Sequence, residues 1–282
     1  MKPDMATTRG SRGDATRSME LLWGIGPTPT RGPKQGLSVE RIVDAAVALA
    51  DDEGIDAVTM RRIADVLGVG AMSLYTYVPG KAELIDLMLD RAYGEVLAAV
   101  TSEGDWRAAL ESRARADWAV YERHPWVVRA AGPRPILGPN ELAVNEATLR
   151  AVDGIGLSGQ EMAAVVTLVA GYVSGVARGI AEATAEGETH APEGTWWTER
   201  SAVLDRVFDA ERFPVSSRLA AEGVFDGDES AADYLAHEIR VTFEFGLERV
   251  LDGVAALVAA RAAGDGPPAP SPPSGGAPRR QP

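Results

Sequence analysis

The sequence predicts an all-α protein with two parts, a small N-terminal three-helix unit and a larger helical domain. Apolar residues recur at the spacing of one helix face through most of the chain, and no segment alternates as a strand would. Gly and Pro divide this pattern into pieces of helix length. With 282 residues, 45% of them hydrophobic, the chain is long enough for two cored domains.

The N-terminal unit is predicted from its helix ends. Ser38 is placed as the N-cap of a first helix that ends at Gly54, and Thr59 as the N-cap of a second. Gly68 can take the left-handed conformation that ends a helix. A short third segment and a longer helix from Lys81 to about Val100 follow. The inward positions of these segments are Ile42, Val43, Ala46, Leu49, Ala50, Ile63, Ala64, Leu67, Val69, Leu74 and Val78.

The remainder of the chain is helical in pattern. Helices are predicted near 105–123, 125–131, 140–153, 159–186, 195–212 and 230–262. Residues 1–36 are expected to form a mobile extension, within which the apolar island 19–24 can dock on the folded body. We therefore divide the chain into this extension, an N-terminal domain at 37–97, a second domain at 98–262 and a disordered Pro- and Gly-rich tail at 263–282.

Composition and charge limit the cellular setting. The absence of cysteine excludes disulfides, thiolate catalysis and zinc fingers. We see no secretory signal and no apolar run long enough to cross a bilayer, so a cytoplasmic protein is expected. The net charge is −13, but residues 1–81 hold 10 basic and 10 acidic residues, so all the excess negative charge lies beyond them. A neutral N-terminal part is only a weak electrostatic footprint for nucleic acid.

Residues 59–81 carry the most specific signal, because two short helices joined by a glycine turn are typical of a helix-turn-helix DNA-binding motif. With Val69, Leu74 and Val78 inside, small and polar side chains of the third segment face outward, where they can contact base edges and phosphates. A plain three-helix unit with surface tyrosines remains the alternative. The candidate DNA-binding residues of this motif are Arg61, Gly70, Ala71, Met72, Ser73, Tyr75, Thr76, Tyr77 and Lys81.

Residues 38–97 closely resemble the DNA-binding domain of the tetracycline-repressor (TetR) family of bacterial regulators. The resemblance rests on Ile-Val-Asp-Ala-Ala at 42–46, Glu-Gly at 53–54, Met-Arg-Arg-Ile-Ala at 60–64, Leu-Gly-Val at 67–69, Ser-Leu-Tyr-Thr-Tyr-Val at 73–78 and Lys-Ala-Glu-Leu at 81–84. It implies a transcriptional regulator, most simply a repressor, that binds palindromic double-stranded operator DNA as a homodimer and leaves it when a small-molecule effector binds. By the same resemblance Thr59 occupies a position that touches DNA, while residues 70–72 lie where members vary and are expected to help select the operator.

The second domain carries a pattern suited to pairing. Small residues recur every four positions along 159–186, at Ala163, Thr167, Gly171, Gly175, Gly179 and Ala183. Such a stripe allows a second helix to approach closely, within one chain or between two. Residues 243–251 resemble, more loosely, the last helix of the tetracycline repressor's own C-terminal domain type. The expected dimer-interface residues are Gly171, Gly175, Gly179, Phe243, Gly246 and Val250.

An effector pocket is harder to place. The apolar face opposite the glycine stripe, together with nearby aromatic residues, predicts a largely apolar small-molecule ligand. For each of these side chains a place in an ordinary core is the favoured alternative. The candidate ligand-binding residues are Trp118, Tyr121, Val165, Val169 and Tyr172, while Trp196 and Trp197 are placed at a pocket lid or a helix start.

Catalysis, a metal site and a cofactor are not expected. The three histidines are scattered, and there is no phosphate-binding glycine loop. Asp233 and His237 lie four apart on a predicted helix and could share a metal, but a surface ion pair is the favoured interpretation. His124, directly before Pro125 at a helix break, is the one candidate for the histidine that helps bind metal and drug in the tetracycline repressor, but no motif supports that site. The remaining alternative is an all-helical small-molecule carrier without specific DNA binding.

Overall fold

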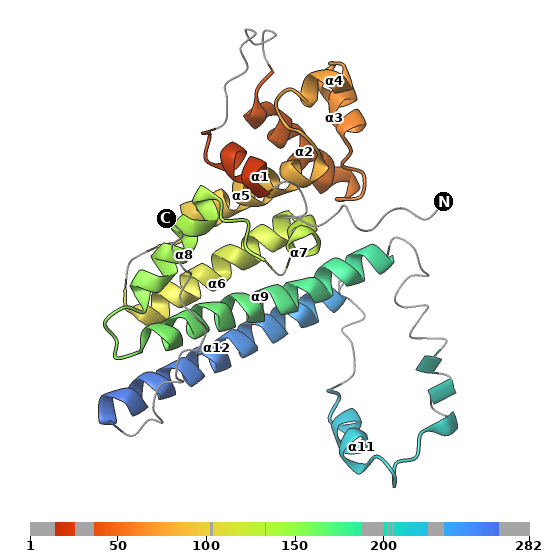
Figure 1. The fold of residues 1–282 in the computed structure, drawn as a ribbon. Helices are drawn as coiled ribbons and strands as arrows, with labels where there is room; N and C mark the ends of the chain where they lie inside the picture. Colours follow the sequence, from red (N-terminus) through yellow and green to blue (C-terminus); the bar gives the residue numbers. More distant parts are fainter. Residues whose placement is uncertain are drawn as a thin grey trace, which may run out of the picture.

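In the computed structural model the chain folds into a small helical head above a larger helical body (Figure 1). The structure describes residues 15–25, 37–101, 104–132, 134–187, 200–201, 203–204, 206–224 and 234–264, and within these ranges no strand is present. The head comprises α2 (Val39–Glu53), α3 (Met60–Leu67) and α4 (Ala71–Leu74). The predicted all-α class is confirmed.

The helix ends follow from their caps. Ser38 and Thr59 accept the backbone N–H groups of Arg41 and Arg62 at 3.3 and 3.2 Å, as the sequence predicted for N-caps of α2 and α3. Gly68 ends α3 with φ of 67°, a conformation that costs a glycine little. The sharp turn after α3 therefore depends on residue 68.

Helix α5 (Lys81–Ala99) joins the head to the body. It packs against α2 in the head, and against α6 (Trp106–Arg123), α7 (Trp126–Ala130) and α8 (Pro139–Ala151) in the body. One continuous cluster of buried apolar side chains includes residues of the head and of these three body helices, for example Ile42, Ile85 and Trp126. Head and body are therefore packed together rather than joined by a free linker.

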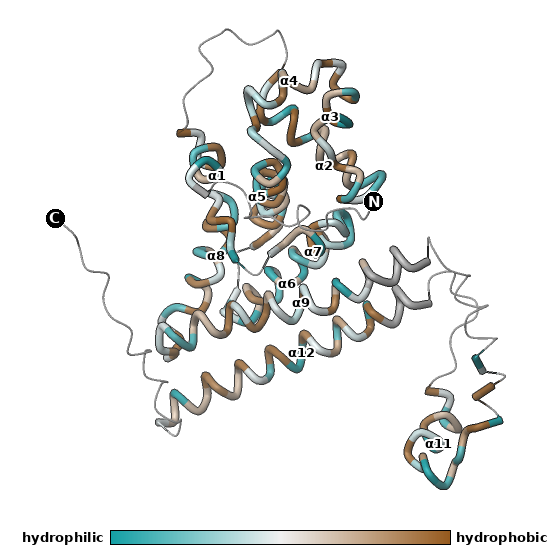
Figure 2. Tube along the Cα trace, turned by 45° about the vertical axis from the view of Figure 1, so that its right-hand side comes forward, coloured by the Kyte–Doolittle hydropathy of each residue, from teal (hydrophilic) through white to brown (hydrophobic). Residues whose placement is uncertain are grey.

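The outer layer of the body consists of two long helices, α9 (Gly159–Gly187) and α12 (Tyr234–Ala263), which pack against each other and, on α9's inner side, against α6. A second core lies here, around Trp118, Val169, Phe243 and Leu251. Both views place α12 at the edge of the molecule opposite the head (Figures 1 and 2).

The stretch Gly159–Gly179 of α9 is long and apolar enough, by length and composition alone, to cross a membrane, with only 28% of the stretch buried. This corrects the expectation that no such run exists. One side of α9 lies in the core, with Val165, Val169 and Val173 buried, while Leu168 on the other side is 52% exposed. The apolar character of the helix thus exceeds what this single chain buries.

Two helices were not predicted. Residues Ala15–Leu22 form α1, which packs against α5, buries Leu22 and is followed by Trp23, whose indole N–H donates to the carbonyl oxygen of Leu137 at 3.0 Å. The apolar island 19–24 thus docks on the body as expected, but as part of a helix. The helix α11 (Pro214–Ala221) lies where the sequence showed only a break at Pro214, and it buries none of its residues. Most of the predicted helix at 195–212, and the tail from 265, fall outside the described residues.

Candidate DNA-binding surface and effector region

The short helix α4 is fixed to the head from its inner side. Leu74 and Val78 are completely buried, and Val69 packs against the same core, as the sequence predicted. Because these three residues anchor the segment, its opposite side is turned to solvent. Helix α4 itself has only four residues, so the outward side chains come from α4 and from the turn at 75–77.

The predicted DNA-binding residues differ in their exposure to solvent. Met72 is 79% exposed and Tyr75 42% exposed, and Arg61, Gly70 and Thr76 are exposed as well. Ala71, Ser73, Tyr77 and Lys81 are half-buried, and Tyr77 packs partly against the head core. Asp65 is the only acidic residue in 59–81. The outward side of 70–77 therefore carries small, apolar and hydroxyl-bearing side chains, and Arg61 and Lys81 are the predicted cations of the site.

Two of these residues also have roles inside the head. The side chain of Thr59 caps α3. Lys81 is the first residue of α5, where its ammonium group is partly withdrawn from water; this burial lowers its pKa, and the negative charge of Asp56 opposes the shift. A cation at a helix start is placed unfavourably relative to the helix dipole. A phosphate group bound there would relieve both effects.

The aromatic and aliphatic residues predicted to bind a ligand are used within the chain. Trp118 stacks on Phe243 with ring centroids 4.3 Å apart, and Val165 and Val169 are buried in the same core. The hydroxyl of Tyr172 donates to the carbonyl oxygen of Thr242 at 2.8 Å, linking α9 to α12. An enclosed space of about 10 Å³ beside Trp118 and Tyr121 is no larger than a water molecule.

The body contains a buried polar cluster that the sequence analysis missed. Arg113 donates from Nε to Asp117 at 2.8 Å and from Nη1 to the hydroxyl of Thr148 at 2.9 Å, and all three residues are buried. Burial raises the pKa of Asp117, against the lowering effect of Arg113. Burial also raises the pKa of the neighbouring Tyr93 and Tyr121 hydroxyls, helped by the charge of Glu141 at Tyr93 and of Asp117 at Tyr121.

The signal for this cluster was present in the sequence. One helix face is formed, by spacing, from Leu110, Arg113, Ala114, Asp117, Trp118 and Tyr121. A charged pair four residues apart usually lies on a helix surface. Arg113 and Asp117 instead occupy positions within the apolar stripe, and this distinguishes them from an ordinary surface ion pair.

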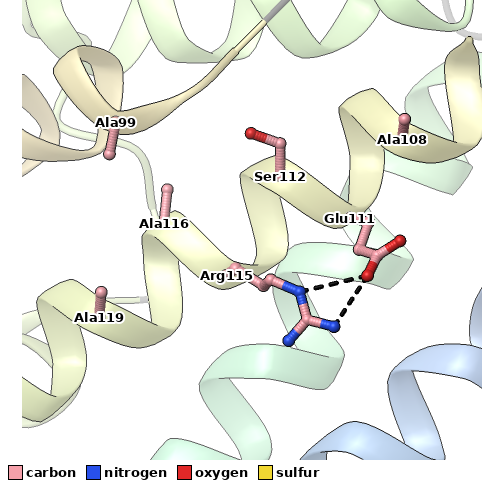
Figure 3. Close-up of a pocket in the computed structure, with 7 residues that line it drawn as sticks. All are labelled: Ala99, Ala108, Glu111, Ser112, Arg115, Ala116 and Ala119. Atoms are coloured by element: carbon pink, nitrogen blue, oxygen red, sulfur yellow. Dashed lines mark hydrogen bonds and ion pairs between the residues drawn. The ribbon is translucent and has the colours of Figure 1, made fainter. Parts of the chain in front are cut away.

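A wider hollow lies on the outside of α6, with a volume of about 480 Å³ (Figure 3). Its walls are mainly small, with four alanines at Ala99, Ala108, Ala116 and Ala119. Arg115 also lines this hollow. It pairs with Glu111 of the same helix (Figure 3) and with Glu244 of α12. None of the predicted ligand residues lines this hollow.

The predicted dimer residues divide into two groups. A side chain added at Gly171, Gly175 or Gly179 would meet nothing within 4 Å in this chain, so the glycine stripe is open. In contrast, Phe243 is buried in the core of its own chain, Val250 packs against that core, and Gly246 lies against Tyr172. The exposed apolar side chains of α12 are instead Val241 and Phe245, at 51% and 64%.

No group of three histidine or acidic side chains suited to a metal occurs among the residues that the structure describes. Trp196, Trp197 and Asp233 lie outside those residues, and the side chain of His237 is not described. His124 is buried between two carboxylates, Asp51 and Glu95, rather than facing a ligand cavity.

A helix-turn-helix head packed on a helical body defines a class of DNA-binding transcriptional regulators. The pattern of the family described as "Bacterial regulatory proteins, tetR family" matches residues 42–88, and that of "Tetracyclin repressor-like, C-terminal domain" matches residues 100–258. The chain therefore belongs to the TetR family and is a helix-turn-helix transcriptional repressor rather than an enzyme.

Relatives from actinobacteria support this assignment. The chain is 42% identical over 258 residues, 91% of each chain, to the HTH-type transcriptional repressor DrrR1 of Streptomyces coeruleorubidus. Apo ActR from Streptomyces coelicolor superposes with a TM-score of 0.61 at 28% identity, covering 85% of this chain and all of that one. ActR in complex with actinorhodin matches with a TM-score of 0.60 at 26% identity, covering 80% of this chain and 97% of that one.

Proposed function

We propose that this repressor binds a palindromic operator as a two-fold dimer through α4 and the turn after it, and that a small-molecule effector releases it. The observation that carries the proposal is the outward side of α4. Met72 and Tyr75 are exposed there while Leu74 and Val78 fix the segment from within. Large apolar side chains held rigidly at a surface are suited to contact with thymine methyl groups and base edges.

The dimer is inferred from the side of α9 and α12 that one chain leaves uncovered. Gly171 and Gly175 have open space above them, and Leu168 and Phe245 are 52% and 64% exposed. Glycine in a helix interior costs about 1 kcal/mol relative to alanine, so such a stripe favours a close helix–helix contact. A second copy would cover this apolar surface and form a four-helix interface. The α12 part of that interface is assigned to Val241 and Phe245 in place of Phe243, Gly246 and Val250.

The effector site is assigned to the buried cluster of Arg113, Asp117 and Thr148, with Tyr93 and Tyr121 beside it. A buried ion pair costs desolvation energy and adds little stability, so its presence at the centre of the body favours a binding role. The cluster lies between α5, α6 and α8, where a bound molecule would separate helices that now touch. An effector would therefore carry polar groups for the cluster as well as the apolar surface first expected.

Release from the operator follows from this placement. Helix α5 contributes Tyr93 to the effector region and begins at Lys81 in the head. A molecule that binds better when α5 is displaced shifts the population toward dimers with a different spacing of their α4 segments. The bound spacing must be about 34–36 Å, one turn of DNA, for both segments to enter successive major grooves. A family of soluble regulators also makes the cytoplasm the expected location.

A selection from random duplex DNA tests the DNA-binding part of the proposal. We expect a palindromic motif whose affinity falls as salt rises, because phosphate contacts release counterions. Failure of well-folded, dimeric protein to select any motif would favour the helical carrier over the regulator. Effector candidates are then tested by whether they release the recovered duplex.

A further inference from the structure

A buried histidine joins the head to the body at the break between α6 and α7. His124 is buried, and its Nδ1 lies 2.7 Å from Oδ1 of Asp51 at the end of α2. Its Nε2 lies 3.3 and 3.4 Å from the two carboxylate oxygens of Glu95 on α5. One side chain of the body thus contacts both the head and the helix that links head to body.

The neighbouring residues make this junction specific. The indole N–H of Trp126 donates to the same Asp51 oxygen at 2.7 Å, so His124 and Trp126 hold one carboxylate together. Glu95 also receives Arg123 at 2.6 Å. Close by, Arg129 of α7 pairs with Asp56 of the head at 3.0 Å. The charged groups at the ring are therefore Asp51 from α2, Glu95 from α5 and, through Glu95, Arg123 from α6.

The number of protons on His124 decides how many of these contacts can form. Ionised carboxylates only accept hydrogen bonds, so each needs an N–H from the ring. The charged ring has two N–H groups and can satisfy Asp51 and Glu95 at once. The neutral ring has one, and its other nitrogen then presents a lone pair to a carboxylate. A protonation change at this site alters the contact between head and body directly.

We propose that His124 is a proton-dependent latch that fixes the head on the body, and that operator binding weakens when the latch loses its proton. The inference rests on α4 being the DNA-reading segment. A head that is already held at one angle loses little conformational entropy when the dimer binds two successive major grooves. The latched form therefore has the higher operator affinity. His124 positions the head and does not touch DNA.

The latch is tested first without DNA, on the full chain containing 5-fluorotryptophan. The fluorine signal of Trp126, assigned with Trp126→Phe, is followed by NMR between about pH 5 and 8, the range in which histidine ordinarily titrates. We expect this signal to titrate in the parent and in His190→Gln, which removes one of the other two histidines. The titration should be absent in His124→Gln. A Trp126 signal that does not change with pH in the folded parent would overturn the latch whether or not the chain binds DNA.

The second measurement is the affinity for the duplex recovered by selection, at constant ionic strength over the same pH range. The parent and His190→Gln should lose about tenfold in affinity as pH rises, the effect of one charge-assisted hydrogen bond. His124→Gln should bind weakly and with little further pH dependence, while remaining folded and dimeric. Equal pH profiles for the parent and His124→Gln would contradict the latch and leave the DNA-binding function intact.

Discussion

The hydroxyl of Tyr172 on α9 lies against Gly246 on α12. It occupies the space that the Cβ atom of any other residue at position 246 would fill. A Cβ atom at this position would overlap the tyrosine oxygen and lie 2.6 Å from the ring carbon that carries it. The same hydroxyl donates to the backbone carbonyls of Thr242 and Phe243 at 2.8 and 3.1 Å. Gly246 therefore permits the close approach of α9 and α12 within one chain.

We predict that Gly246→Ala lowers the free energy of unfolding by about 1–3 kcal/mol, as expected when a packed contact is overfilled. Gly159→Ala is the matched control, because a Cβ at position 159 meets nothing within 4 Å. Thermal unfolding of the parent and both variants measures the difference. A Gly246→Ala protein as stable as the control would show that α9 and α12 are not packed as described.

Asp117→Ala is predicted to destabilise the body by about 3–5 kcal/mol, because it leaves the buried guanidinium of Arg113 without its carboxylate. Replacing both residues, as Arg113→Met with Asp117→Leu, should restore most of that loss by removing both charges. Urea unfolding gives the comparison. If the double variant were as unstable as Asp117→Ala, the ion pair would be a requirement of the fold rather than a tolerated polar cluster.

The double variant Arg113→Met with Asp117→Leu also separates the stability of the fold from the response to an effector. We predict that it keeps operator affinity but is no longer released by a molecule that releases the parent. The measurement is the fraction of operator bound against ligand concentration, with Glu146→Gln as a control on the exposed side of α8. Release of the double variant at the parental ligand concentration would place the effector elsewhere.

The ion pair between Glu161 on α9 and Arg261 on α12 predicts a defined acid sensitivity. The hydrogen bond from Arg261 is the largest cause that lowers the pKa of Glu161, from 4.5 to about 2, followed by those from Ser158. The stabilising contribution is therefore complete above about pH 4.5 and is lost as pH falls towards 2. Glu161→Gln should unfold at lower urea than the parent at pH 6, and this difference should shrink at pH 3. A difference that does not change with pH would contradict the lowered pKa.

At the reading surface, Tyr75→Ala and Lys81→Ala are predicted to weaken operator binding by roughly 5- to 150-fold, about 1–3 kcal/mol each, in proteins that remain folded and dimeric. Tyr75→Phe separates the contribution of the hydroxyl from that of the ring. Arg150→Ala, which removes an exposed cation from α8, serves as the control. If Tyr75→Ala and Lys81→Ala bind like Arg150→Ala, the reading surface has been assigned to the wrong residues.

Much of the fold could be predicted because its signals are local. Capping residues such as Ser38 and Thr59, and the left-handed Gly68, define helix ends within a few residues of sequence. The inward positions Leu74 and Val78 follow from the same period and are buried as predicted. Once these inward positions are known, the residues on the outward side of α4 follow from helix geometry. This candidate surface could therefore be predicted from the sequence.

The effector region and the head–body junction depend on contacts between distant residues, which periodicity does not encode. Asp51 and His124 are 73 positions apart, and Arg113 meets Thr148 across 35. Trp118 is predicted to line a pocket because aromatic residues often do, and Phe243 to line the interface because it lies on one side of the last helix. In the structure the two rings stack on each other in the core. Helix α1 was missed because its apolar island is too short to show a period, although Leu22 is buried by α5 and its surroundings.

The most direct test of a two-fold DNA-reading dimer is the mass of the complex on the selected duplex, measured by light scattering at several protein ratios. We predict two chains on the full palindrome, much weaker binding to a half-site, and weaker formation of both complexes with Tyr75→Ala. One chain bound to the full site as tightly as to its half would contradict the account.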